Sequence, residues 1–453
     1  MSDVLGEVAD APAELIRPAE HISSSYTNLS NEKFRDYDVD FSNQYCRIYA
    51  ARLETMVPLL KHRVEQKWRS EYPIIKLCNL QEDLHRKCIV IGTLFKDQKL
   101  KPSLLKKIAD ANALIPAVVP THFSDDSDQL YIEDELQRYL LIGNVDVHML
   151  VTGITCALLG SDQGFGKFLV EDICFAQCRP QVERPMGASP DENFICFISG
   201  IDTASYPCHV LHLKLFLDWV IGFMGNKDSQ DQVRKIARVI IAGNSVRSEP
   251  ERKKSTSLVA PVVETNETFN AVKTLDGVLS QLVRVVNVDL MPGQFDPSNH
   301  LLAQQPMHKC MFPQASAFQT LNCVTNPYEF EVNGFRMLGS SGQPVSDVMK
   351  YCRLAQPIDA MEQNLVWSHM APTCPDTLGC YPYNNKDPFA IQDCPHVMFA
   401  GNQPSFQTKM VTGPEGQNVR LICVPPFGQS FSVVLLNLSN LDCHEMLFEI
   451  DDC

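Results

Sequence analysis

Three short runs in the second half of the chain are apolar at nearly every position, and helical stretches separate them. Strands that are apolar on both faces are typical of a sheet covered on both sides. A further β-rich group follows, beginning with a hairpin across Asn333-Gly334. Residues 193–453 therefore predict an α/β sandwich with its own core. The predicted strands are 194–198, 238–241, 285–288, 329–332, 335–338, 397–400, 419–424, 432–437 and 446–450, and the predicted helices are 208–223 and 268–282.

The first half predicts a different architecture. Residues 1–40 are acidic and lack a period, so we expect a flexible arm that docks locally through Phe34 or Tyr37. Residues 41–68 have helical apolar spacing, with a kink expected at Pro58. Five β-rich runs and one short helix then suit a small closed barrel such as an OB-fold, with sandwich topologies still open. The strands are 87–95, 129–132, 137–142, 151–159 and 167–175, and the helix is 103–109.

The segment 179–193 gathers proline and glycine without an apolar period, which indicates a domain boundary. We therefore expect an arm at 1–40, a helix-plus-barrel domain at 41–182 and a second domain at 193–453. The length of 453 residues allows about three domains of ordinary size. The fold class predicted is thus mixed α+β and α/β.

Charge and cysteine use narrow the function. The net charge of −15 is the wrong sign for a protein that mainly grips phosphate backbones, and the basic run Arg252 to Lys254 lies in a polar loop. The 17 cysteines include no C-x-x-C pair, which favours reduced thiols in the cytosol or nucleus. The longest apolar stretch, 149–160, falls short of the ~18 residues that a membrane span needs. The acidic start is not that of an export signal.

Four loops that follow predicted strands are the natural places for a site, because ligands of open α/β sheets bind beyond the carboxyl ends of strands. Each loop contains a glycine that permits a sharp turn or a close backbone approach. The loops are Ser199-Gly200-Ile201-Asp202, Gly243-Asn244-Ser245, Pro292-Gly293-Gln294-Phe295-Asp296 and Gly401-Asn402-Gln403-Pro404.

This arrangement resembles the calcineurin-like metallophosphoesterase fold, whose loops supply Asp-x-His, Gly-Asp, Gly-Asn-His and Gly-His ligand pairs. Two hydrolytic metal ions need carboxylates and imidazoles. Here no Gly-Asp, Gly-His or Gly-Asn-His occurs, and Asn244, Asn402 and Pro404 stand where ligands are expected. Only Asp202 and Asp296 contribute charge. We therefore expect neither a metal site nor a catalytic residue.

Other motifs are better explained structurally. Asp146-Val147-His148 spells Asp-x-His but has no companion ligands nearby, so it is interpreted as a turn carboxylate beside a surface histidine. The stretch 160–167 has the wrong spacing for a phosphate loop and is interpreted as a hairpin turn. His209 and His212 lack the glutamate of a zinc-protease helix.

The motifs of the second domain, taken in order, resemble the B-subunit family of replicative DNA polymerases, and residues 290–297 favour its polymerase delta members. With the barrel, the similarity covers the chain from about residue 41 onward. The segments that carry it are 197–200, 242–244, 288–299, 304–306, 310–313, 325–328, 338–339, 342–343, 376–382 and 394–397.

The resemblance implies an OB domain packed on a calcineurin-like phosphodiesterase domain that has lost its metals. It implies a non-catalytic scaffold in DNA replication and repair, located in the nucleus, that binds no cofactor and no membrane and touches DNA only indirectly or weakly. Its partners would be the polymerase delta catalytic subunit, docked through a cysteine-rich carboxyl-terminal region that carries zinc or iron–sulfur, and a third, elongated, clamp-binding subunit.

The docking surfaces are less defined. Candidates are the barrel's outer face and the loop 374–389, with Cys380, Tyr381 and Tyr383. Aromatic residues of the barrel either stack on single-stranded bases or fill the barrel and meet a partner; these are Tyr131, Tyr139, Phe165 and Phe168. Two alternative functions stay open, an active metal-dependent phosphodiesterase and an OB-type single-stranded DNA binder.

Overall fold

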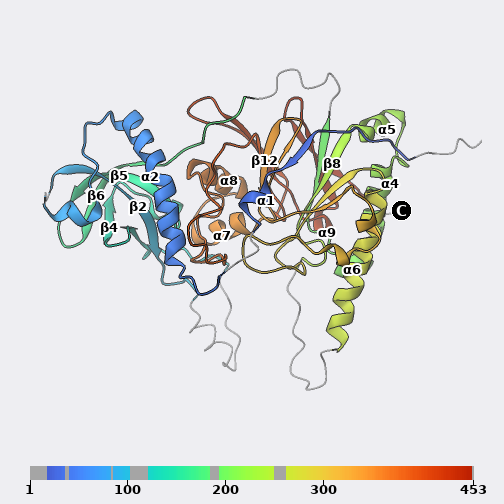
Figure 1. The fold of residues 1–453 in the computed structure, drawn as a ribbon, viewed down its shortest axis with the longest axis horizontal. Coiled ribbons are helices and arrows are strands. Elements are labelled where there is room, and N and C mark those ends of the chain that lie inside the picture. Colours follow the sequence, from blue (N-terminus) through green and yellow to red (C-terminus); the bar gives the residue numbers. More distant parts are fainter. Residues whose placement is uncertain are drawn as a thin grey trace, which may run out of the picture.

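The apolar runs of the sequence form strands in the computed structural model, which describes residues 18–35, 40–82, 85–102, 121–183, 193–248 and 262–450. Figure 1 shows a barrel at one end of an elongated molecule and a sheet sandwich filling the rest. The predicted mixture of helices and sheets is confirmed. Among the described helices, none combines the length and the apolar character that crossing a membrane requires.

Five strands close into the barrel in the order β2-β3-β4-β6-β5, with β5 returning to β2. Helix α2 (Cys46–Trp68) lies along the outside, and its residues Val64 and Trp68 pack on Ile89 and Leu159. Its buried residues recur every three or four positions, as an amphipathic helix requires. The barrel strands are β2 (Lys87–Asp97), β3 (Gln129–Glu133), β4 (Arg138–Gly143), β5 (Thr155–Asp162) and β6 (Lys167–Cys174), with η1 (Leu77–Glu82) and η2 (Val147–Met149) beside them.

The second domain contains two six-stranded sheets packed face to face, with a core of large apolar side chains between them. The first sheet has the order β1-β11-β12-β13-β15-β14 and the second β10-β9-β8-β7-β16-β17. Strands β7, β8 and β9 run parallel, as do β12 and β13. The strands of the first sheet are β1 (Tyr26–Asn28), β11 (Tyr328–Val332), β12 (Phe335–Ser340), β13 (Val397–Ala400), β14 (Gln407–Thr412) and β15 (Asn418–Cys423). Those of the second are β7 (Phe194–Ile198), β8 (Ile236–Ala242), β9 (Asn287–Met291), β10 (Leu321–Cys323), β16 (Ser432–Asn437) and β17 (Cys443–Leu447).

Helices cover both outer faces of this sandwich (Figure 1). The second sheet packs on α4 (Tyr206–Ile221), α5 (Lys227–Arg234) and α6 (Val262–Leu282). The first packs on α7 (Gln343–Tyr351) and α8 (Pro357–Val366). The apolar cluster around α7 and α8 continues without interruption into the barrel interior, so one core spans both domains. The remaining short helices are α1 (Ser30–Lys33), α9 (Phe427–Ser430), η3 (Thr203–Ser205), η4 (Lys309–Met311) and η5 (Ala315–Ala317).

The prediction of a flexible arm over 1–40 is wrong for residues 18–35. Strand β1 extends the first sheet by pairing antiparallel with β11, and Phe34 is 1% exposed within the common core. Local docking through Phe34 is therefore confirmed, whereas Tyr37 lies outside the described residues. The contacts of this segment follow no regular period, because they come from separate short pieces: residues 19–22, strand β1 and the single turn of α1.

Other element boundaries moved. Helix α2 begins at residue 46 rather than 41, and the last strand, predicted at 446–450, is β17 at residues 443–447. The predicted helix at 103–109, most of the boundary segment and the basic residues 252–254 lie outside the described residues. The Asn333-Gly334 hairpin is confirmed, with both residues at positive φ, as a tight turn of this type requires.

Candidate functional site

The four loops singled out in the sequence meet at one edge of the sandwich. The amide of Gly200 donates to the carbonyl of Gly243 at 2.9 Å. Asn402 connects its own loop to two other strand ends, since its Nδ2 donates to the carbonyls of Ala242 at 3.1 Å and Ser341 at 2.9 Å. The loop after β12 therefore joins the predicted four. Parallel strands deliver their carboxyl ends to the same edge, which is why segments far apart in sequence come together.

Two glycines show how closely these loops pack against one another. A Cβ atom at Gly293 would lie 2.1 Å from the amide nitrogen of Asn244. Gly243 has φ +83°, and a Cβ there would lie 2.4 Å from that of Ser341. No side chain fits at either position, so glycine is required by close approach and by backbone conformation together.

A pocket of about 370 Å³ opens between the loops, and the described residues that line it are polar but uncharged. Neither Asp202 nor Asp296 lines it. Amide and hydroxyl groups dominate, with one aromatic ring and two prolines. The lining residues are Asn244, Ser248, Gln294, Phe295, Ser341, Gly342, Gln343, Ser346, Asn402, Gln403, Pro404, Pro426 and Gln429.

Asp296 holds loops together instead of facing the pocket. Its Oδ1 accepts from the amide of Val246 at 2.7 Å, and its Oδ2 accepts from those of Gly293 at 2.8 Å and Ser245 at 3.1 Å. The residue is 3% exposed. Burial raises the pKa of this carboxyl to about 6, although the backbone donors favour its charged form. With its oxygens occupied by three amides, Asp296 is a clamp between two loops.

Asp202 and Ser199 of the predicted loops also make contacts that hold the loops together. Asp202 has a left-handed backbone, φ +52°, and its amide donates to the carbonyl of Asn244 at 3.3 Å. Ser199 is fully buried, and its Oγ accepts from the amide of Asn402 at 2.9 Å while contacting the carbonyl of Pro425 at 3.0 Å. Pro292 is buried, and Pro404 is exposed at the pocket.

An amide network beneath the pocket was not predicted as a site. Asn326 Nδ2 donates to Gln304 Oε1 at 2.8 Å and to Gln343 Oε1 at 3.0 Å. Gln343 Nε2 also donates to Gln304 Oε1, at 2.9 Å, and Ser341 donates its amide to Asn326 Oδ1. All of these residues occur within or beside the motifs that carried the family resemblance, which was the one signal able to find them.

The residues at this edge do not fit a two-metal hydrolytic centre. Such a centre needs several carboxylates and imidazoles directed at one point. In the described part of the chain, no group of three or more His, Cys, Asp or Glu side chains is placed to hold a metal ion. No step of metal-assisted hydrolysis can be assigned to these loops.

The residues predicted for partner docking are largely inside the protein. Cys380 is 0% exposed and Tyr383 5%, and Tyr383 Oη accepts from the amide of Ala303 at 3.2 Å. The docking prediction is therefore wrong for these two side chains, which offer no surface. Tyr381 is partly exposed and meets the ring of Phe41 edge-on at 5.8 Å. The structure places Cys380 and Tyr383 of this predicted docking loop in the core.

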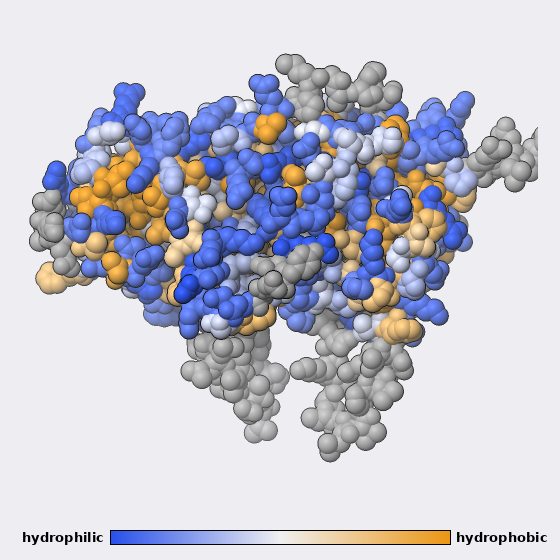
Figure 2. Space-filling view, viewed as in Figure 1, coloured by the Kyte–Doolittle hydropathy of each residue, from blue (hydrophilic) through white to orange (hydrophobic). Residues whose placement is uncertain are grey.

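The barrel aromatics divide in the same way. Tyr139 and Phe168 are buried in the barrel interior, at 2% and 0% exposure. Tyr131 is partly exposed, and Phe165 stands fully exposed at the β5–β6 turn. Figure 2 shows hydrophobic residues gathered at the surface of the barrel end. The Asp146 motif is a turn, as expected, with its carboxylate accepting from the amide of His148 at 3.0 Å.

The two domains are joined by a buried ion pair. Arg52 on α2 is enclosed, and its Nε lies 2.5 Å from Asp387 Oδ2. Its other nitrogens donate to the carbonyls of Gly153, Pro372 and Cys374. Burial alone would raise the pKa of Asp387, but the Arg52 guanidinium and the neighbouring histidine ring hold it well below its ordinary value. A charge this completely paired fixes the helix against the second domain.

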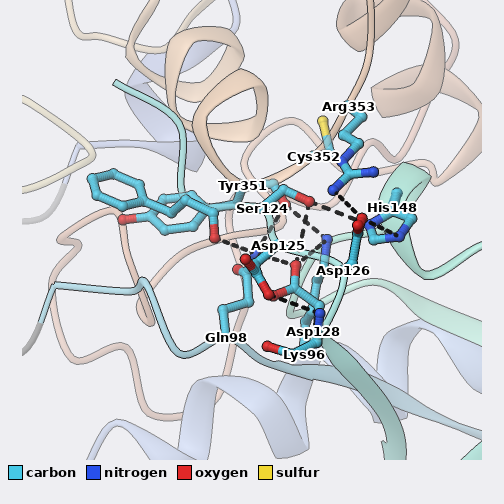
Figure 3. A network of polar contacts seen from close by, with 12 residues as sticks. Lys96, Gln98, Ser124, Asp125, Asp126, Asp128, His148, Tyr351, Cys352 and Arg353 are labelled. Atoms are coloured by element: carbon cyan, nitrogen blue, oxygen red, sulfur yellow. Dashed lines mark hydrogen bonds and ion pairs between the residues drawn. The ribbon is translucent and has the colours of Figure 1, made fainter. Parts of the chain in front are cut away.

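A second polar cluster also joins the barrel domain to the sandwich (Figure 3). We call this boundary between the two domains the seam. Lys96 of β2 is 1% exposed, and its Nζ donates to the carbonyl of Tyr351 at 2.8 Å and lies 3.5 Å from Asp128. At the rim, Asp126 pairs with Arg353 at 2.6 Å. Burial lowers the pKa of Lys96, and Asp128 opposes that change. Charged groups from the barrel thus contact the end of α7 directly.

Comparison with known proteins finds two family models that match different parts of the chain. The model for the B-subunits of DNA polymerases alpha and epsilon matches residues 195–408. The model described as "DNA polymerase delta subunit OB-fold domain" matches residues 44–173. The first match lies in the sandwich, and the second takes in helix α2 and the barrel.

Relatives at the level of whole chains extend this similarity. "DNA polymerase delta subunit 2" of Drosophila melanogaster is 41% identical over 95% of this chain and 99% of the relative. "DNA polymerase delta small subunit" of Arabidopsis thaliana is 38% identical over 95% of this chain and 96% of the relative. The protein of that name in Saccharomyces cerevisiae is 29% identical over 91% and 90%. The aligned lengths take in both domains, and with them the pocket loops and the seam.

Proposed function

The chain belongs to the small-subunit family of DNA polymerase delta, and from this we propose that it is the assembly scaffold of a replicative polymerase rather than an enzyme. In this proposal it links the cysteine-rich carboxyl-terminal region of the catalytic subunit to a third, elongated, clamp-binding subunit. It acts in the nucleus, in replication and in repair synthesis.

One observation carries the non-catalytic part of the proposal. The carboxyl-end loops of the sandwich close around a pocket that no charged side chain of the described residues lines, and both oxygens of Asp296 are bonded to backbone amides. We interpret the sandwich as a phosphodiesterase-like domain whose metal ligands have been replaced by amides. In this interpretation the chain binds no cofactor, and any zinc or iron–sulfur group belongs to the catalytic partner.

The rigid connection between the barrel and the sandwich supports the proposed role in assembly. A scaffold must hold two partners at a fixed separation, and buried charges at Arg52 and Lys96 tie the barrel to the sandwich around one common core. Stable multi-subunit interfaces bury about 2,000 Å² or more, which two joined domains can offer.

Co-purification tests the proposal directly. A tagged full-length chain is expected to recover a large polymerase subunit and a third subunit in fixed ratio, and its depletion is expected to reduce the catalytic subunit's stability or processivity. Recovery of the chain alone from nuclear extract under mild salt would contradict the scaffold role.

Metal analysis separates the scaffold from the phosphodiesterase alternative. The purified protein and its Asp202→Ala and Asp296→Ala variants are expected to hold no stoichiometric manganese or zinc through these residues. Two ions per chain that disappear in the variants, together with turnover of a phosphodiester, would replace the proposal.

A specific observation keeps the single-strand alternative testable. Phe165 is fully exposed, and the Arg138 guanidinium lies 4.2 Å from the ring centre of Phe95 and 5.6 Å from that of Tyr131 on the barrel wall. Aromatic and arginine surfaces of this kind can stack on bases. Titration with a labelled oligonucleotide decides this, and binding weaker than about micromolar near 150 mM salt leaves DNA contact indirect.

A further inference from the structure

The pocket at the loop edge contains hydrogen-bond donors that no group among the described residues uses. Asn244 is 7% exposed and lines the pocket. Its Oδ1 accepts from the amide of Phe295 at 3.3 Å. Its Nδ2 has no hydrogen-bond acceptor in the described part of the chain. This nitrogen is not enclosed by protein atoms, so it is open to the pocket. This donor is therefore available to water or to a ligand that enters the pocket.

The amino end of helix α7 opens into the same space. Gly342, Gln343 and Ser346, from its cap and first turn, line the pocket. The capping position is held by Gly342, and no side chain caps the helix. Pro344 carries no N–H, and the amide of Gln343 has no acceptor within the described residues. Such an end carries a partial positive charge of roughly half a unit and attracts anions.

The oxygens of the nearest buried carboxylate, that of Asp296, do not face the pocket. Asp296 is turned toward Val246, Ser245 and Gly293, whose amides surround its oxygens, and it is not part of the lining. Among the residues that the structure describes, no carboxylate side chain lines the pocket. Its volume of about 370 Å³ falls within the ~300–1,000 Å³ typical of small-molecule sites.

From this convergence we propose that the pocket binds one phosphate-type oxyanion, without any metal ion, through Asn244 Nδ2 and the first turn of α7. Ser346 supplies a further hydroxyl donor from the same helix face. The amide lining accepts a group whose charge is spread over several oxygens, because each oxygen can take a separate neutral donor. This property is independent of the assembly role.

Equilibrium dialysis of labelled inorganic phosphate against the full-length protein, purified with its accompanying subunits and in the presence of EDTA, tests the proposal. We expect saturable binding of one phosphate that Asn244→Asp weakens at least tenfold. That change keeps the oxygen that Phe295 needs, but replaces the donor by a carboxylate. Gln281→Glu, on the exposed face of α6, makes the same change of charge and is expected to leave binding unaltered.

Ser346→Asp provides a second variant that leaves the Asn244 loop intact, and it is expected to weaken binding to a similar extent. Deoxyadenosine monophosphate is then used as a competitor. Tighter binding than inorganic phosphate identifies a nucleotide as the source of the group, and weaker binding identifies free phosphate. Absence of saturable binding in EDTA, or binding that both variants leave unchanged, would overturn the proposal.

Discussion

Arg52 Nε lies 2.5 Å from Asp387 Oδ2, and both side chains are completely buried where helix α2 meets the sandwich. His369 completes the cluster, since its Nε2 lies 2.8 Å from the same carboxylate oxygen and its Nδ1 accepts from the amide of Ala371 at 3.2 Å. This histidine is therefore held as the neutral tautomer with its proton on Nε2. This cluster is built around one cation and one carboxylate, both of them removed from water.

Removing the cation should be strongly destabilising. Arg52→Met keeps much of the side-chain volume but leaves the Asp387 carboxylate buried without its main partner, and it frees three backbone carbonyls. We expect a loss of about 3–5 kcal/mol in the free energy of unfolding. Urea unfolding of the full-length protein measures it. Arg234→Met, which breaks a half-exposed pair with Asp231, is the control and should cost less than about 1 kcal/mol. Equal losses would show that the seam pair is not structural.

Two glycines offer a matched pair at the loop edge and in a helix. Gly293→Ala places a Cβ 2.1 Å from the Asn244 amide nitrogen, so a loop must move, and we expect a loss of about 3 kcal/mol or more and a lower melting temperature. Gly277→Ala in α6 meets nothing within 4 Å and should stabilise by roughly 0.5–1 kcal/mol through helix propensity. Thermal unfolding of both variants checks the contrast. A Gly293→Ala protein of unchanged stability would mean that the loops are not tightly packed.

The Asp296 clamp predicts a particular dependence on pH. Its pKa of about 6 in the folded protein exceeds the ordinary value, so the folded state binds the proton more tightly than the unfolded chain. Stability from this group therefore increases as the pH falls from about 6 to about 4. Asp296→Asn lacks this titration, and its amide cannot accept all three backbone bonds, so it should lose about 1–3 kcal/mol.

The free-energy gap between the natural protein and Asp296→Asn is accordingly expected to be larger at pH 4.5 than at pH 7.5. Urea unfolding at the two values measures it, and other titrating groups cancel in the difference. A gap that widens toward pH 7.5 would show that the backbone donors, rather than burial, dominate the carboxyl's pKa.

Local pattern explains why so many strands were predictable. Strand β7 at residues 194–198 and strand β16 at 432–437 have their predicted limits, because both are buried on two faces; β7 is apolar throughout, and β16 is apolar between Ser432 and Asn437. The edge strand β14 was missed: Lys409 and Met410 are exposed, so no face imposed an apolar period. The pairing of β1 with β11 joins residues about 300 apart, and nothing near Tyr26 in sequence records it.

For the candidate site too, the sequence predicted local features but not contacts between distant segments. The sequence placed Gly243, Asn244 and Gly401 correctly at one edge, because glycine turns after apolar strands are local features. It could not show that Asp296 turns toward backbone amides, since the partners lie on another loop. It also could not reveal that Cys380 is enclosed, because its cover comes from the barrel and from distant loops.

The tip of the β5–β6 hairpin supports a last prediction. Phe165 is fully exposed and has φ +53°, a left-handed conformation that suits glycine or asparagine better than phenylalanine. Because the ring contributes no burial in this chain, Phe165→Asn should raise the free energy of unfolding by up to about 1 kcal/mol. Urea unfolding measures this, with Phe168→Asn as the contrast. Phe168 is 0% exposed inside the barrel, so its loss should cost at least ~3 kcal/mol. Destabilisation by Phe165→Asn would show that the ring packs on the protein after all. A stabilised variant that associates less well with its partner subunits would instead place the exposed ring in an interface.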